Sequence, residues 1–201
     1  MGTPSRLVSG DPGHGAQLFQ ELDCVRCHVE PRTGTGVNIP AALRDAGSRS
    51  RAEWIEAYLL EPRPLRYVSE DRRPERIMPA LVTRPEDARD LAALLSTWRD
   101  TVRVPETSNR LGPAKNEDRR QEGRMLFEQY QCLGCHEFGG DGGHVGPALD
   151  GVGSRRRPAF VLAMLEHPDR VVPGTAMEDK KLWDSEAEAI TTYLMNLQSK
   201  R

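Results

Sequence analysis

The sequence contains one short cysteine motif twice, and the two copies use all four cysteines of the chain. The copies are Cys24-Val25-Arg26-Cys27-His28 and Cys132-Leu133-Gly134-Cys135-His136. In a C-x-x-C-H motif, the two thiols are spaced to form thioether bonds with the vinyl groups of a haem, and the histidine is placed to bind its iron. The two copies therefore predict two covalently attached haem c groups, with Cys24, Cys27 and His28 holding one and Cys132, Cys135 and His136 holding the other.

Three other kinds of site also use paired cysteines. A structural zinc site would need both pairs to converge on one metal ion, and a thioredoxin-like site needs one pair at the start of a helix that follows a strand. A disulfide framework has no need for the histidine. Because a histidine follows both pairs, haem attachment is favoured over these alternatives.

The motifs lie inside a longer internal repeat, which predicts three helices in each copy. A short amphipathic helix precedes each motif, and a second helix follows a Gly-Ser-Arg sequence and ends near Pro62 or Pro168. A third helix has apolar residues at steps of three and four. The matched residues are Gly15, Leu18 and Phe19 with Gly123, Leu126 and Phe127 in the first helix, and Ala88, Leu91 and Leu95 with Ala187, Ile190 and Leu194 in the third.

The repeat predicts an all-α fold of two tandem domains, because no alternation of apolar and polar residues is long enough for a useful strand. We expect the domains to span residues 1–100 and 121–201. Residues 101–120 are polar and charged, with two prolines and no aromatic residue, and are interpreted as a linker. The sequences from Thr83 to Glu86 and from Ser185 to Glu188 predict capping boxes at the starts of the third helices.

Each repeat also contains one methionine that could complete an iron site. Met78 and Met177 coincide when the repeats are superposed, and each lies in a Pro- or Gly-containing segment between two predicted helices. A loop can direct a thioether towards the iron, so both are candidate axial ligands, although a methionine can also fill a gap in a core.

Two prolines and one of the remaining histidines are candidates for roles around the iron. Pro40 and Pro147 coincide in the repeat, and their carbonyl groups are candidate acceptors for the Nδ1–H of the ligand histidine, although ordinary loop prolines fit equally well. His14 and His167 match no other histidine and are interpreted as solvated. His144, in a glycine-rich segment, is an alternative candidate ligand.

Composition narrows the class of protein. The 201 residues include 28 Lys and Arg against 30 Asp and Glu, for a net charge of −2, so no basic surface for nucleic acid is expected. No run approaches the roughly 18 apolar residues of a membrane-spanning helix. The first residues lack the apolar segment of a secretory signal. We therefore expect that a signal or anchor has been removed, or that the chain was cut from a longer polypeptide.

The order of these features resembles class I cytochrome c, twice over and across nearly the whole chain. It is most similar to the dihaem cytochromes made of two fused class I domains, such as the c-four kind, and to dihaem subunits of respiratory complexes. The resemblance implies a few helices wrapped around each covalently bound haem, with His28 and Met78 as ligands in the first domain and His136 and Met177 in the second. It also implies that the first and last helices cross, with Gly15 and Phe19 against Leu95 or Trp98, and Gly123 and Phe127 against Leu194.

The resemblance further implies an electron carrier rather than an enzyme, in the periplasm or another extracytoplasmic compartment. Its partners would be an electron donor and an electron acceptor, with a membrane respiratory complex among the candidates. The stretches Arg63 to Arg76 and Arg155-Arg156-Arg157 are candidate docking surfaces, although the first also fits an ordinary solvated face. The alternatives are a peroxidase-like haem enzyme or a gas-binding sensor, either of which needs one iron with an open position.

Overall fold

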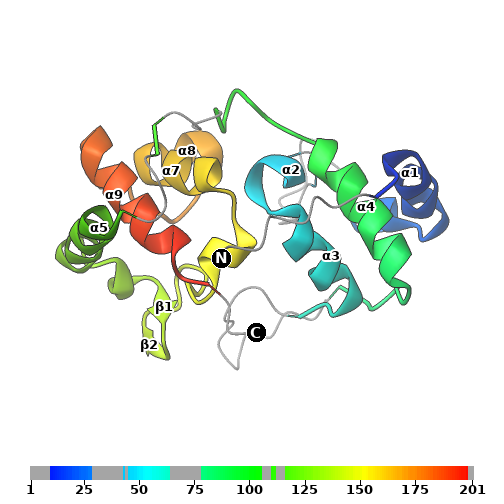
Figure 1. The fold of residues 1–201 in the computed structure, drawn as a ribbon, viewed down its shortest axis with the longest axis horizontal. Helices are drawn as coiled ribbons and strands as arrows, with labels where there is room; N and C mark the ends of the chain where they lie inside the picture. Colours follow the sequence, from blue (N-terminus) through cyan, green and yellow to red (C-terminus); the bar gives the residue numbers. More distant parts are fainter. Residues whose placement is uncertain are drawn as a thin grey trace. The chain divides into compact units, whose positions relative to one another are not determined.

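The computed structural model describes residues 10–28, 43, 45–63, 78–105, 110–111 and 116–198 (Figure 1). Within these ranges the chain forms two compact units. Unit 1 comprises residues 10–62 and 78–100, and unit 2 comprises Arg63 and residues 101–198. Both units are built mainly of helices, which confirms the predicted all-α fold.

Unit 1 is organised around the crossing of its first and last helices. Its elements are α1 (Pro12–Glu21), the 3-10 turn η1 (Cys24–Arg26), α2 (Ala46–Arg49), α3 (Ala52–Leu60) and α4 (Pro85–Thr97). Gly15 allows α1 to approach α4 closely, because a Cβ there would overlap the carbonyl group of Asp90. One turn further on, the rings of Phe19 and Trp98 meet edge to face with their centroids 5.2 Å apart. Leu18, Ile55, Leu59, Leu91 and Leu95 complete the buried core.

Unit 2 repeats this plan. Its elements are α5 (Glu117–Gln129), η3 (Cys132–Gly134), β1 (Glu137–Phe138), β2 (Asp141–Gly142), α6 (Val152–Arg155), α7 (Pro158–Glu166), α8 (Pro168–Val171) and α9 (Asp184–Met195). Gly123 on α5 lies against the Ala189 carbonyl of α9, and the rings of Phe127 and Tyr193 pack with centroids 5.5 Å apart. Unit 2 also contains the short antiparallel hairpin β1–β2 and the single turn α8, whose counterparts in the repeat fall wholly or partly outside the described residues of unit 1.

The capping boxes predicted for the third helices are wrong by one or two residues. Helix α4 begins with Pro85 after Arg84, and helix α9 begins after Trp183, whose N–H donates to the Glu186 carboxylate over 2.9 Å. Glu188 does not reach back to the helix start, because its carboxylate bonds to Arg110 and Arg119. In α9, ion pairs with other segments therefore hold the carboxylate of the expected cap, whereas in α4 Glu86 pairs with the neighbouring Arg84.

Part of the segment expected to be a linker packs on unit 2. Val104 is buried against Ala159, Ala163 and Val171, and Arg170 donates to the Val102 carbonyl over 3.0 Å. The Arg110 guanidinium pairs with Glu166 over 2.5 Å and with Glu188 over 3.3 Å. Helix α5 itself begins inside the expected linker, at Glu117, where the Asn116 side chain accepts the N–H of Arg119.

Among the described residues, no helix combines the length and the apolar character that crossing a bilayer requires.

Candidate functional site

Each cysteine motif forms one tight turn directly after the first helix of its unit. The turn starts at a residue with positive φ, Asp23 in unit 1 (52°) and Gln131 in unit 2 (53°), which redirects the chain at the end of the helix. In both units the histidine N–H then donates over 3.0 Å to the carbonyl of the first cysteine, Cys24 or Cys132. The two thiols and the imidazole of each motif are thus carried by a single compact loop.

The two cysteines of each motif differ in exposure. Cys24 and Cys132 are half-buried, Cys27 and Cys135 are exposed, and none of the four forms a disulfide. Burial raises the pKa of the Cys24 and Cys132 thiols, and the nearby Lys180 opposes this rise at Cys132. Each motif therefore presents one outward cysteine and one that borders the core.

In unit 2 a glycine-rich loop wraps around the cysteine motif. The N–H of Gly143 donates to the Leu133 carbonyl over 2.8 Å, and the N–H of Gly146 donates to the Cys135 carbonyl over 2.7 Å. Gly142 has φ +112°, and a Cβ there would overlap the His136 carbonyl. The glycines let the loop follow the motif at a distance that larger residues would prevent.

The same loop holds the ring of His136. Its Nδ1 lies 2.8 Å from the carbonyl oxygen of Pro147. Because a carbonyl oxygen only accepts, Nδ1 must carry the proton, which leaves the Nε2 lone pair of the neutral ring available to a metal. Gly146 lies flat against this ring, since a Cβ there would be 2.6 Å from Nδ1 and 2.9 Å from Nε2. The loop thus sets both the tautomer and the orientation of His136.

The candidate methionine of each unit lies at the same apolar core as the first cysteine of its motif. Met78 and Cys24 are partly buried against the unit 1 core, and Met177 and Cys132 against the unit 2 core. The structure therefore brings the predicted thioether and thiol of each unit to one cluster, although they are far apart in the sequence.

The other residues singled out from the sequence are placed as follows. Pro40 lies outside the described residues, and His28 is half-buried. His14 is exposed but paired, with its Nδ1 2.7 Å from Asp90 Oδ2, and Asp90 also accepts the N–H of Asp11 over 2.7 Å. The His144 Nδ1 lies 3.4 Å from the Glu137 carboxylate.

Arg155 is a candidate site residue that the sequence reasoning assigned elsewhere. It was expected on a docking surface with Arg156 and Arg157, yet its guanidinium donates to the carbonyl of Ala148, next to Pro147. Its Nε is sealed from solvent with no hydrogen-bond partner among the described residues. Burial lowers the pKa of this guanidinium. The sequence feature that could have indicated this role is the match of Arg155 with Arg49 in the repeat, because a matched pair indicates a structural position within each unit.

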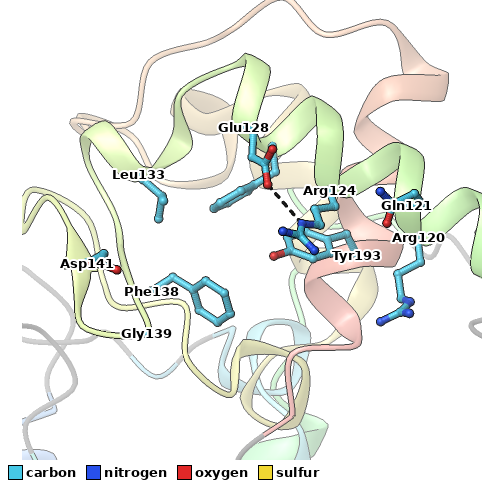
Figure 2. Close-up of a pocket in the computed structure, with 10 residues that line it drawn as sticks. Arg120, Gln121, Arg124, Glu128, Leu133, Phe138, Gly139, Asp141 and Tyr193 are labelled. Atoms are coloured by element: carbon cyan, nitrogen blue, oxygen red, sulfur yellow. Dashed lines mark hydrogen bonds and ion pairs between the residues drawn. The ribbon is translucent and has the colours of Figure 1, made fainter.

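An open pocket of about 490 Å³ lies between α5, α9 and the β1–β2 hairpin of unit 2 (Figure 2). Phe127, Phe138 and Tyr193 line it, and the ion pair between Arg124 and Glu128 lies at its edge. None of the cysteines, histidines or methionines predicted to hold haem lines this pocket. Within the described residues, no three His, Cys, Asp or Glu side chains are grouped to bind a metal ion.

The chain is similar to known proteins along most of its length. The family described as Cytochrome c matches residues 13–98 and 121–198. The chain is also 31% identical over 86 residues to the protein named Cytochrome c oxidase subunit 2 of Alkalihalophilus pseudofirmus. That match covers 38% of this chain and 25% of the relative, so the chain spans about a quarter of the length of the curated relative it matches.

Proposed function

Because the chain belongs to the cytochrome c family, we propose that it carries single electrons between redox proteins through two haem c groups, one in each unit. The observation that carries this proposal is the duplicated arrangement of a cysteine-histidine turn and a loop methionine around one apolar core. In unit 1 the haem would be held by Cys24, Cys27, His28 and Met78. In unit 2 it would be held by Cys132, Cys135, His136 and Met177.

The residues of unit 2 fit a haem. Haem c supplies an iron that gains and loses one electron without making or breaking a bond, and it carries two carboxylate groups. The unpartnered Nε of Arg155 is a buried donor that suits such a carboxylate, and arginine is the side chain whose geometry best matches one.

The chain's own residues would prepare this site for electron transfer. Pro147 holds His136 with Nε2 directed away from the hydrogen bond, and Gly146 leaves the ring room to lie in that orientation. Met177, partly buried against the unit 2 core, would offer a neutral sulfur, and the apolar core would limit access of water. A neutral thioether ligand and burial both favour the ferrous state, so we expect reduction potentials on the high side.

We further propose that the partners belong to a respiratory chain outside the cytoplasm. The similarity to a protein named Cytochrome c oxidase subunit 2 supports a respiratory partner. Electron-transfer encounters bury small areas and dissociate quickly, so a transient complex is expected.

The test is an optical study of the purified holoprotein. A pyridine haemochrome assay counts the haems, and the weak far-red band of ferric haem with a sulfur ligand reports the methionines. We expect two haems per chain, a far-red band that scales with both, and no spectral change of the reduced protein with carbon monoxide. Carbon monoxide binding at one haem would contradict the carrier proposal for that unit and favour a gas-binding or peroxidase-like site there.

A further inference from the structure

The two units place a matched arginine in the same backbone setting. Arg49 ends α2 and Arg155 ends α6, and both four-residue helices contain the sequence Gly-Ser-Arg. Each helix is tied to the end of the last helix of its unit, since Gly47 N–H donates to the Trp98 carbonyl and Gly153 N–H to the Leu197 carbonyl. The two arginines can therefore be compared directly.

The charges around the two arginines differ. Asp45 precedes α2, is only 1% exposed, and accepts the Arg49 Nε over 2.7 Å. The matched position before α6 is Gly151, a buried residue with φ +63° and no side chain. Unit 1 thus buries a carboxylate beside its arginine, and no described residue of unit 2 does the same beside Arg155.

No other described group compensates Arg155 in the same way. Asp150 acts on it electrostatically, but Asp150 is exposed and its carboxylate accepts the N–H of Gly139. Arg63, the other charged residue that acts on Arg155, has the same sign. Exposed charges are screened by solvent far more than buried ones, so the buried Asp45 is the larger difference between the units.

This difference acts on the iron through its charge. A ferric haem carries one more positive charge than a ferrous haem, so a nearby buried carboxylate stabilises the ferric state and a guanidinium destabilises it. The haem carboxylates are the same in both units, so the additional buried carboxylate of Asp45 sets the difference between them. We propose that the haem of unit 2 has the higher reduction potential of the two and that Asp45 keeps the potential of the unit 1 haem low. In half-reduced protein the electron therefore resides in unit 2. This inference rests on the proposed function, because it requires one haem in each unit.

The test is a spectroelectrochemical titration of the holoprotein and four variants, each first shown to contain two haems by pyridine haemochrome. Asp45→Asn removes the buried carboxylate, and we expect it to raise the lower midpoint potential and leave the higher one in place. Arg155→Gln should lower the higher midpoint, whereas Arg155→Lys, which keeps the charge, should lower it less. Glu56→Gln is the matched control, because it removes a partly exposed carboxylate that pairs with an arginine, Arg89, at 3.4 Å, and it should move neither midpoint.

The outcomes separate the inference from the proposed function. A wild-type chain with fewer than two haems would contradict the proposed function. Two haems with an Asp45→Asn shift no larger than that of Glu56→Gln, or a shift of the higher midpoint instead, would overturn the inference alone. If Asp45→Asn does not fold, the two Arg155 variants test the inference instead. The inference is overturned if Arg155→Gln leaves the higher midpoint potential unchanged or moves only the lower one.

Discussion

Replacement of Gly146 by alanine tests how His136 is held. The new Cβ would lie over the ring, closest to Cε1 and 2.6 Å from Nδ1, whereas ordinary contacts begin at 3.4 Å, so the ring or the loop must move by about 1 Å. Because the clash is with the face of the ring, such a movement carries Nδ1 out of line with the Pro147 carbonyl oxygen, 2.8 Å away, and weakens this hydrogen bond.

The cost of this replacement follows from two terms. Weakening of the hydrogen bond costs up to about 1.5 kcal/mol, and overpacking costs about 1–3 kcal/mol. We therefore expect Gly146→Ala to lower the free energy of unfolding of unit 2 by about 1–4.5 kcal/mol. The measurement is denaturant unfolding of the holoprotein followed by haem absorbance, together with the far-red band of the ferric protein.

Gly134→Ala is the matched control, because a Cβ at Gly134 has no atom within 4 Å. Both variants reduce the entropy of the unfolded chain equally, so this effect cancels in the comparison. If the free energy of unfolding of Gly146→Ala lies within about 0.5 kcal/mol of that of Gly134→Ala and the far-red band remains, the His136 ring is not held as described.

Three further predictions follow from contacts in the two units. Met78→Ala and Met177→Ala should each remove about half of the far-red band and open one haem to carbon monoxide, and a full band in either variant would exclude that methionine as a ligand. Hydrogen bonding to Asp90 raises the pKa of His14 above 6.5, so this pair should stabilise unit 1 below about pH 6.5 and lose that effect as the pH rises through the raised value. The thermal unfolding midpoints of wild type and His14→Gln should therefore differ at acidic pH and converge at alkaline pH. A difference that stays constant with pH would contradict this prediction. Arg110→Ala should lower the free energy of unfolding of unit 2 by roughly 1 kcal/mol or less, because the ion pairs are partly exposed, and the loss should shrink in high salt when followed by denaturant unfolding.

The helices were predictable because their apolar residues recur with helical spacing in both repeats. The family resemblance implied that Gly15 and Gly123 lie at the helix crossings, and the structure places both at close approaches. Helix ends were less predictable, because they depend on which acid reaches which partner. Glu188 bonds to arginines from other segments, and that choice is set by tertiary structure.

Part of the candidate site was also predictable from the sequence. Local spacing identified the cysteine-histidine turns, and the repeat nominated Met78 and Met177, which remain predictions as ligands. The role of Arg155 was not visible, because its isolation depends on the missing partner at Gly151 and on burial of its Nε. The run of arginines around it suggested a surface instead. The packing of Val104 also escaped notice, since a single valine in a polar segment carries no periodic signal.

The crossing of first and last helices has a consequence for the order in which the protein matures. Helix α1 cannot bury its apolar face until α4 has been synthesised, and α5 waits in the same way for α9. At about 5–20 residues per second, the roughly 100 residues that follow α4 take about 5–20 s to make. During that interval unit 1 has all the segments it needs to close, whereas unit 2 is still incomplete. We therefore expect unit 1 to fold around the first cysteine motif before unit 2 folds around the second. Haem would then be attached to the two motifs at different stages of folding.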